Sequence, residues 1–334
     1  MTRAPNGFGR RRRILVTHTQ IAQSAVDLLN DHDIDVFFSP PYDPSDVVAA
    51  RAAELRIDAM MVRQGRITDE VIGASPGLKV IVKHGVGVDN IDLAAAEARG
   101  IPVLRSMGSN SRAVAEHAIA LALMLVKQIQ PLNAAVKGGG WPKPTFIGKD
   151  FQGATLGLVG YGGIGRETAR MAEALGMEVV VHDPYAPEAA EADGFATAAD
   201  LEAMLPALDI LSLHCPLTSA TRDLIDARRL AMMKRTAVIV NTARGGIIDE
   251  AALADALRAG TIAGAALDSF ATEPPAADNP LWELPTLVAT PHIGGVTAGS
   301  SRAMAEIAAR HIISVLDGNP PDERALARPA DLAA

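Results

Sequence analysis

The sequence predicts an α/β protein built from two doubly wound parallel sheets. Short runs of β-branched and apolar residues alternate with longer Ala- and Leu-rich windows along most of the 334-residue chain. Strands that alternate with helices in this way form parallel sheets with helices on both faces. Strand runs such as Val80-Ile81-Val82 are continuously apolar, which is typical of strands buried on both sides.

Eleven strands are predicted from these runs. In the first part of the chain they are residues 13–17, 35–38, 59–62, 80–83 and 102–104. After a long apolar helix they are residues 155–160, 178–182, 210–214, 237–241, 264–268 and 287–290. Helical windows between them include residues 167–175, 198–205 and 250–258.

Two stretches of the chain resemble each other. Residues 80–89 and 238–249 each lead a buried strand into a glycine-containing turn and then to a hydrophobic-Asp step that starts a helix. Upstream, residues 57–62 echo residues 208–213. The length also corresponds to about two domains of 100–200 residues each. We therefore predict two domains with similar winding.

The composition excludes several classes of protein. Hydrophobic residues make up 49% and charged residues 21%, which is ordinary for a globular chain and wrong for a disordered one. The net charge of −8 argues against a nucleic-acid partner, which would require a basic face. The single cysteine, Cys215, cannot form an intramolecular disulfide, so we expect a reducing, cytoplasmic location. No apolar run reaches the ~18–20 residues of a membrane span, so no membrane partner is expected.

Both ends are expected to be frayed tails. Arg10 to Arg13 precede an apolar stretch, residues 14–16, that is too short for the hydrophobic region of a signal peptide. A cationic tail before the first strand is therefore the simpler interpretation. Residues 325–334 are predicted to be a second frayed tail.

The segment from Ser111 to Ile129 is apolar on nearly every face. A helix that is hydrophobic all round is buried, either in a large core or in a subunit interface. Three glycines and two prolines after it, within residues 138–144, predict a flexible loop. We expect this helix to form the contact of a homodimer.

A glycine motif points to a dinucleotide site. Gly160, Gly162 and Gly165 fill the pattern G-x-G-x-x-G after an apolar strand and at the start of a helix, which is the context that the motif requires. Such glycines permit a tight turn, and the amides of the helix N-terminus hold a pyrophosphate. Asp183, eighteen residues after Gly165, ends the next strand. A carboxylate there accepts from the ribose hydroxyls of NAD and repels the 2′-phosphate of NADP. The alternative is a structural glycine turn with a surface acid.

Three polar residues each follow the C-terminal end of a predicted strand: Arg244, Glu273 and His292. In open parallel sheets these strand ends form the ligand crevice. An arginine can bind a carboxylate and polarise the adjacent carbonyl. A histidine can move the proton that accompanies hydride transfer, and a carboxylate on its other ring nitrogen fixes its tautomer. Taken singly, the three could equally be a surface arginine, a helix-start glutamate and a capping histidine.

Together, the glycine loop, Asp183 and residues 241–249, 266–274 and 290–295 resemble the D-isomer-specific 2-hydroxyacid dehydrogenases. The resemblance implies a Rossmann cofactor domain, residues 109–295, inserted in a flavodoxin-like substrate domain formed by residues 1–108 and 296–334. It implies NAD-dependent interconversion of a small D-2-hydroxy acid and its 2-oxo acid, such as phosphoglycerate or glycerate and hydroxypyruvate. Arg244, Glu273 and His292 then occupy the catalytic positions.

The resemblance also implies binding residues. For the cofactor they are Gly160, Gly162, Gly163, Ile164, Gly165, Asp183, Cys215, Pro216, Thr221, Thr242, Ala243, Asp268 and Gly295. For the substrate they are Lys83, Val86, Gly87, Asn110 and Arg244, with amides near Val86 and Gly87 as donors to the carboxylate. No metal is expected, because His84, His117 and His214 lack metal-ligand spacing with cysteines or acids.

The sequence departs from the family pattern at several positions. Lys83 stands where many relatives carry arginine, and residues 106–110 replace a more usual proline-containing loop. Glu273 argues against the formate-specific branch, where glutamine is expected. The chain ends about forty residues after His292, so the regulatory C-terminal domain of long phosphoglycerate dehydrogenases is not expected.

Two questions stay open at this point. Arg63 and Arg66 could receive a substrate phosphate or a larger acid, or could be solvated. An NAD(H)-sensing protein of the corepressor type on the same fold is the alternative to an enzyme, and it would bind NADH without turning over any 2-oxo acid.

Overall fold

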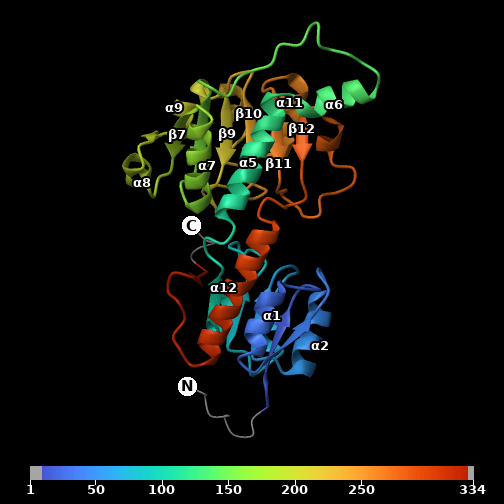
Figure 1. Ribbon diagram of the computed structural model, residues 1–334, viewed down its shortest axis with the longest axis vertical. Helices are drawn as coiled ribbons and strands as arrows, with labels where there is room; N and C mark the ends of the chain where they lie inside the picture. Colours follow the sequence, from blue (N-terminus) through green and yellow to red (C-terminus); the bar gives the residue numbers. More distant parts are fainter. Residues whose placement is uncertain (1–9, 330–334) are drawn as a thin grey trace. The chain divides into compact units, whose positions relative to one another are not determined.

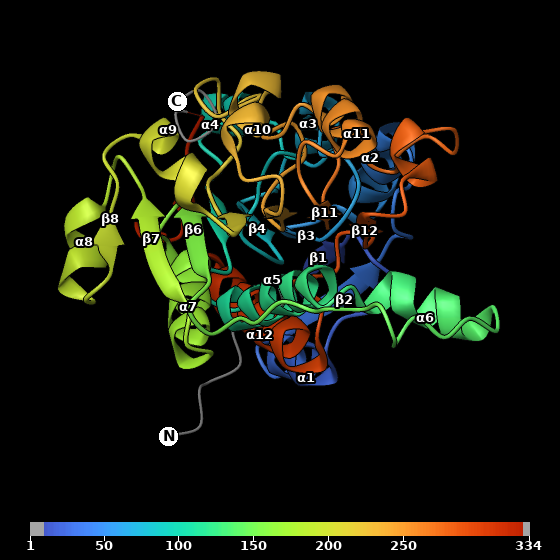
Figure 2. The same ribbon diagram turned by 90° about the horizontal axis from the view of Figure 1, so that it is seen from above.

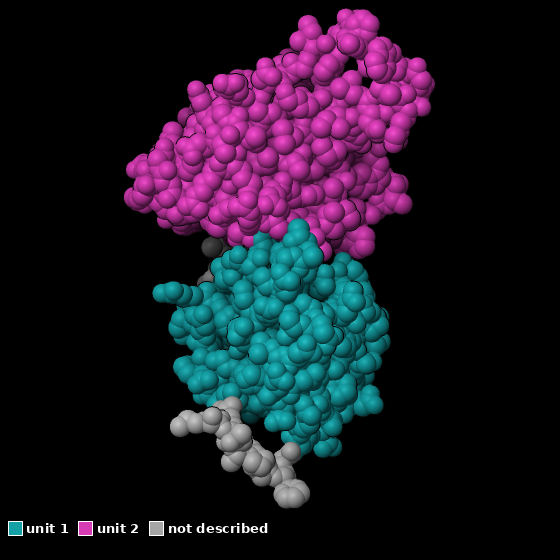
Figure 3. Space-filling view, viewed as in Figure 1, with its two compact units in different colours: residues 1–110, 297–333 teal, residues 111–296, 334 magenta. Residues whose placement is uncertain are grey.

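The structure is a computed structural model, and it describes residues 10–329 (Figure 1). The chain divides into two compact units (Figure 3). The described part of unit 1 comprises residues 10–110 and 297–329, and unit 2 comprises residues 111–296. The chain passes from one unit to the other between residues 110 and 111 and again between residues 296 and 297. Each unit is built around one sheet.

Unit 1 contains a six-stranded sheet in the order β13-β5-β4-β3-β1-β2. All neighbours pair in parallel except β13, which is antiparallel to β5. The strands are β1 (Arg12–Val16), β2 (Ile34–Phe38), β3 (Ala59–Val62), β4 (Val80–Lys83), β5 (Val103–Arg105) and β13 (Leu326–Ala327).

Helices cover both faces of this sheet, as Figure 2 shows. On one face lie α1 (Gln23–Asn30) and α12 (Ala298–Leu316). On the other lie α2 (Ser45–Leu55), α3 (Asp69–Gly73) and α4 (Leu93–Ala98). Every residue of β3 is buried, because its side chains meet a helix layer on each side. The long helix α12 starts with a reciprocal capping box between Thr297 and Ser300.

Unit 2 contains a seven-stranded, fully parallel sheet in the order β12-β11-β10-β9-β6-β7-β8. The strands are β6 (Thr155–Val159), β7 (Glu178–His182), β8 (Ala196–Thr197), β9 (Ile210–Leu213), β10 (Val238–Asn241), β11 (Gly264–Leu267) and β12 (Leu287–Ala289). The strand order reverses between β6 and β9, and ligands of such sheets bind outside the carboxyl ends of the strands at this point.

The helices of unit 2 also form two layers (Figure 2). One contains α5 (Ser111–Val126) and α7 (Gly163–Ala174), and α8 (Pro187–Ala192) lies beside β7 and β8. The other contains α9 (Leu201–Met204), α10 (Ala227–Met232) and α11 (Glu250–Ala259). Short 3-10 turns at Leu205–Ala207 and Pro280–Glu283 complete the unit. The remaining helix, α6 (Ile129–Lys137), has no buried residue.

The sequence-based predictions of strands overlap the observed ones in all eleven cases. The two strands that the sequence does not predict, β8 and β13, are each two residues long. Two residues are too few to show the alternation of apolar and polar side chains that marks a strand, and only pairing with a longer neighbour makes them strands.

The prediction of frayed ends is wrong for the described residues. Leu326 and Ala327 pair with β5, and Arg105 donates to the Leu326 carbonyl at 2.7 Å. At the other end Arg12 belongs to β1 and forms an ion pair with Asp317 at 2.8 Å. The edge strand β5 and the carboxylate of Asp317 order these residues. Both lie far away in the sequence, so the local pattern could not predict these contacts. Residues 1–9 and 330–334 of the predicted tails lie outside the described residues.

The long apolar helix expected from Ser111 to Ile129 is two helices. Gln128 adopts a left-handed conformation, with φ of 51°, and α5 and α6 are bent by 57°. Helix α5 is buried by its own unit, against α7, β10 and β11, which accounts for much of its apolarity. Within the described chain no single helix is long and apolar enough to cross a membrane, and the bent pair passes by length and composition only.

Candidate active site

The glycine loop joins β6 to α7, and each glycine of the motif has a distinct environment. Gly160 has φ of 97°, and a Cβ there would lie 2.8 Å from the Cys215 nitrogen. A Cβ on Gly165 would lie 2.2 Å from the Gly160 carbonyl oxygen. At Gly162, by contrast, a Cβ would meet no described atom within 4 Å. Packing therefore requires Gly160 and Gly165, whereas Gly162 borders open space, as the approach of a pyrophosphate demands.

Asp183 lies directly beside this loop. Its Oδ2 accepts a hydrogen bond from the Tyr161 amide at 2.7 Å, and its Oδ1 accepts from the amides of Tyr185 and Ala186 at 2.8 and 3.2 Å. These contacts fix the carboxylate at the end of β7. A carboxylate has about four acceptor sites, so this one can still accept from ribose hydroxyls. The loop and the acid together fit a dinucleotide.

The segment after β9 contains further cofactor candidates. The Thr221 hydroxyl donates to the Pro216 carbonyl at 2.6 Å and accepts from the Thr218 amide at 2.8 Å, so it closes the loop after Cys215. Burial raises the pKa of the Cys215 thiol to about 12. The thiol therefore stays neutral and is a packing group rather than a nucleophile.

Arg244 follows β10 in a turn that Asn241 stabilises. The Asn241 side chain accepts from the Ala243 amide at 3.0 Å and donates to the Arg244 carbonyl at 2.8 Å. The Arg244 guanidinium donates to the Ala243 carbonyl at 2.7 Å. A Cβ on Gly245 would lie 1.8 Å from the Phe270 carbonyl carbon. Gly245 thus lets the turn pack directly on the backbone of the segment that carries Glu273.

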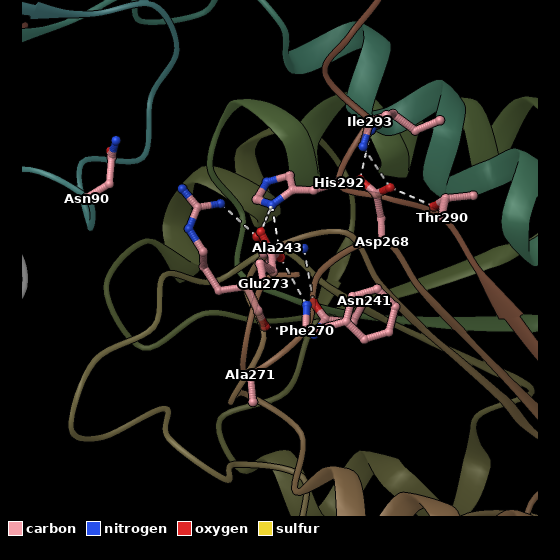
Figure 4. Close-up of polar contacts among 12 residues, drawn as sticks. Asn90, Asn241, Ala243, Asp268, Phe270, Ala271, Glu273, Thr290, His292 and Ile293 are labelled. Atoms are coloured by element: carbon pink, nitrogen blue, oxygen red, sulfur yellow. Dashed lines mark hydrogen bonds and ion pairs between the residues drawn. The ribbon is translucent and has the colours of Figure 1, made fainter. Parts of the chain in front are cut away.

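Glu273 and His292 are hydrogen-bonded to each other (Figure 4). His292 Nδ1 lies 2.8 Å from Glu273 Oε2 and 3.0 Å from Oε1, and Oε1 also accepts from the Phe270 amide at 3.0 Å. A carboxylate can only accept, so Nδ1 carries the hydrogen and Nε2 is left for proton transfer. His292 also has φ of 54°, a strained backbone conformation of the kind concentrated at functional sites.

The charge of Glu273 is stabilised by its neighbours. Burial by itself would raise the pKa of Glu273, but the hydrogen bond and charge of His292, the Phe270 amide and the charge of Arg244 together lower it. The carboxylate therefore stays ionised beside the imidazole. The charge of Arg244 is the smallest of these influences on the Glu273 carboxylate.

Asp268 holds the loop that carries His292. Asp268 is 2% exposed, and its carboxylate accepts from the amides of Ile293 and Gly294 at 2.9 and 2.8 Å. It also accepts from the Thr290 hydroxyl at 2.6 Å, and His117 Nε2 lies 3.0 Å from that hydroxyl oxygen. The same ring nitrogen lies 3.5 Å from Asp268 Oδ1. Burial acts to raise the pKa of Asp268, but hydrogen bonds from His117, Thr290 and the amides of Ile293 and Gly294 outweigh it and lower the pKa. The family resemblance implies that Asp268 contacts the cofactor, and in the structure its carboxylate orders the loop that carries His292.

Four residues of this site were not predicted from the sequence: Asn241, Gly245, His117 and Thr290. The sequence carries a local signal for one of them, since an asparagine at a strand end commonly bonds the backbone two residues on. The other three acquire their roles from chain segments far away.

Three of the four substrate residues expected in unit 1 lie at the end of β4 or in the turn after it, and Asn110 follows β5. Lys83 Nζ donates to the Asn90 side-chain oxygen at 2.7 Å and to the Arg63 carbonyl at 3.2 Å. Val86 and Gly87 belong to the turn that follows, and Asn110 is the last residue of the segment. The Asn110 side-chain oxygen is buried and meets no hydrogen-bond partner among the described residues. In the part of the chain that the structure describes, no group of three or more His, Cys, Asp or Glu could hold a metal.

Comparison with known proteins decides the family. The model of the D-isomer specific 2-hydroxyacid dehydrogenase NAD binding domain matches residues 119–294. The chain belongs to this family. Unit 2 is accordingly an NAD-binding domain, and the open position at Gly162 and the anchored Asp183 fit that cofactor.

Individual relatives agree with this membership. A D-3-phosphoglycerate dehydrogenase of Archaeoglobus fulgidus is 38% identical over 302 residues, which is 90% of this chain and 56% of the relative. The chain thus spans little more than half the length of this curated relative. A solved Thermus thermophilus protein superposes with a TM-score of 0.84 at 36% identity, over 94% of this chain and 99% of the other. A glyoxylate reductase of Paecilomyes thermophila gives 0.80 at 30% identity, over 95% and 97%.

Proposed function

We propose that this protein is an NAD-dependent oxidoreductase that interconverts a small D-2-hydroxy acid and its 2-oxo acid. The observation that carries the proposal is the hydrogen-bonded pair of Glu273 and His292, which shares its surroundings with Arg244 in the unit that holds the glycine loop. Phosphoglycerate, glycerate with hydroxypyruvate, and glyoxylate are the substrates that family membership favours. Unit 1 then acts as the substrate domain, to which Lys83, Val86, Gly87 and Asn110 contribute.

Each residue has a defined task in this mechanism. The cofactor, when bound, supplies or accepts the hydride. The Arg244 guanidinium binds the substrate carboxylate and polarises the adjacent carbonyl. His292 donates a proton from Nε2 to the carbonyl oxygen during reduction and accepts it during oxidation. Glu273 stabilises the imidazolium and keeps the ring oriented.

A panel of small 2-oxo acids assayed with NADH tests the proposal. The panel should include phosphohydroxypyruvate, hydroxypyruvate, glyoxylate and pyruvate. We expect turnover of at least one, with the D-hydroxy acid as product for every acid except glyoxylate, whose product is achiral. Tight NADH binding without turnover of any acid would contradict the enzyme assignment and favour an NAD(H)-sensing protein.

The position of Asp183 predicts a preference for NADH over NADPH. A carboxylate next to the 2′-phosphate of NADPH places like charges together, which costs several kcal/mol, so we expect a preference on the order of a hundredfold in kcat/KM. Asp183→Ser removes the negative charge and should narrow this ratio. Equal efficiency of the wild-type protein with both cofactors would exclude the assigned role.

The pairing of Glu273 with His292 predicts a pH effect. Reduction requires protonated His292 and should decline as pH rises, whereas oxidation requires the neutral ring and should increase. Glu273→Gln removes the charge that stabilises the imidazolium, so both kcat/KM profiles should move to lower pH. Glu250→Gln is a matched control, because Glu250 accepts from the Ala271 amide of the same segment. Profiles that move equally in both variants, or in neither, would refute the pairing.

We also propose that the protein forms a homodimer through the region Ser111–Ile129. Ile129, at the end of this region, is 48% exposed, and Val136 on the next helix is 50% exposed. Light scattering at micromolar concentration should give the mass of two chains, and Ile129→Glu should shift the equilibrium to monomer. A wild-type monomer under these conditions would disprove the dimer.

A further inference from the structure

His117 links the first helix of unit 2 to the loop that ends the unit. It lies in α5, which starts where the chain enters unit 2 at residue 111, and the loop of residues 290–296 ends where the chain leaves it. His117 Nε2 lies 3.0 Å from the Thr290 hydroxyl oxygen and 3.5 Å from Asp268 Oδ1. The motif for the cofactor and the three proposed catalytic residues do not include this histidine.

The hydrogen bonds of this network have a defined direction. The Asp268 carboxylate only accepts, so the Thr290 hydroxyl uses its one hydrogen for the bond of 2.6 Å to Asp268 Oδ1. Towards His117 the hydroxyl oxygen can therefore only accept, and His117 Nε2 must carry a hydrogen in the neutral ring as well as in the charged one. His117 is thus the outer donor of a chain that ends on a buried carboxylate.

The charged form of Asp268 depends on this donor. Burial by itself would raise the pKa of Asp268, and the bond from His117 is the largest of the four hydrogen-bond influences that lower it. The carboxylate in turn holds the loop, since Oδ1 accepts from the Ile293 amide and Oδ2 from the Gly294 amide. Figure 4 shows the bonds from Thr290 and Ile293. Loss of one donor leaves a buried acceptor less satisfied and weakens the whole network.

Close packing adds to the restriction of the loop. A Cβ on Gly294 would lie 3.0 Å from Asp268 Oδ2 and 3.3 Å from His117 Cδ2, so the loop backbone lies directly against both side chains. His292, two residues earlier, has φ of 54°. A non-glycine residue keeps such a conformation only where the surrounding contacts enforce it.

We propose that His117 is a positioning residue, which donates to Thr290 and Asp268 and so holds the loop in the conformation that presents His292 for proton transfer. The catalytic part of this proposal rests on the proposed dehydrogenase function, whereas the ordering of the loop does not. A histidine that only filled space would be replaceable by an apolar side chain. His117→Leu therefore removes the donor and keeps an apolar group, and His117→Gln offers an amide N–H in place of Nε2.

Amide hydrogen exchange, followed by NMR on the full-length protein, tests the ordering of the loop without turnover. The amides of Ile293 and Gly294 should exchange faster in His117→Leu, on the order of tenfold or more, since a bond in a charged network is lost. The amides of β10 should keep their protection, which separates local release from global unfolding. Glu116→Gln is the matched control, because Glu116 precedes His117 on α5 and pairs with Arg112 on the exposed surface. It should exchange like the wild type.

Steady-state kinetics tests the consequence for catalysis. With the best substrate of the panel, His117→Leu should lower kcat on the order of tenfold, and His117→Gln should recover most of this loss. Glu116→Gln should keep the wild-type kcat. Thr290→Val removes the hydroxyl through which His117 acts, so His117→Leu should reduce kcat by a smaller factor in that background than in the wild-type protein.

The two measurements separate failure of this proposal from failure of the proposed function. Unchanged exchange of both loop amides in His117→Leu overturns the proposal, whether or not the protein turns over a 2-oxo acid. Faster exchange with an unchanged kcat, or a His117→Gln variant as impaired as His117→Leu, overturns it as well. If no 2-oxo acid were turned over but His117→Leu still released the loop amides, the dehydrogenase assignment would fail and the ordering of the loop by His117 would stand.

Discussion

Replacing His292 with alanine should reduce kcat on the order of 10²–10⁴-fold, the usual contribution of a positioned acid–base group. The ring is oriented by Glu273 at 2.8 Å and by a loop that Asp268 holds through two amides. Loss of the imidazole leaves the carbonyl oxygen without a proton donor, although the cofactor site is untouched. NADH affinity, measured by fluorescence titration, should therefore stay close to that of the wild-type protein.

His32→Ala is a suitable control for the histidine variant. His32 lies between α1 and β2 in unit 1, where its Nδ1 contacts the Leu28 carbonyl at 2.8 Å. This variant should keep its kcat. If His292→Ala retained a kcat within threefold of the wild-type value, His292 would not be the proton donor.

Replacing Arg244 with alanine should lower kcat on the order of 10²–10³-fold, which is typical for the loss of one preorganised electrostatic contact. KM for the 2-oxo acid should rise as well, because the same guanidinium binds the carboxylate in the ground state. Arg244→Lys should recover only part of the loss, since an ammonium cannot make the bidentate contact. Steady-state kinetics with the best substrate of the panel measures both effects.

The arginine prediction also has a structural control. Arg258→Ala changes an arginine at the end of α11 that pairs with Asp255 on the same helix. Its kinetics should match the wild type. Arg244→Ala frees the Ala243 carbonyl, so its unfolding midpoint must be measured to separate lost chemistry from a disordered turn. A folded Arg244→Ala variant with unchanged kcat and KM would remove Arg244 from the mechanism.

Local patterns account for most of the fold. The strands of both sheets are apolar runs long enough to be recognised, because residues buried on two faces leave no polar interruption. The break at Gln128 could not be predicted, since its neighbours continue the helical pattern and only the backbone turn ends it. The short strand β13 depends on the edge of β5, which lies more than 200 residues earlier in the chain.

Candidate residues that follow strand ends could be predicted for a related reason. Parallel strands bring their carboxyl ends to one edge of a sheet, so the order of elements alone places Arg244, Glu273 and His292 in one region. No comparable rule predicts the contacts that hold these residues in place. Gly245 is restricted by the backbone of Phe270, and His117 reaches Thr290 across 173 positions of the sequence.

The sequence by itself thus determined the α/β class, the family, the NAD motif and the identities of the candidate catalytic residues, because each can be recognised from short local patterns along the chain. The tertiary structure alone decided which oxygen each donor meets, that Asp268 orders the His292 loop, and that Arg63 rather than Arg66 lines a cavity. These outcomes depend on distances between segments that are remote along the chain. Those distances are set by the packing of the helix layers on both faces of each sheet, which forms only when the whole unit is folded.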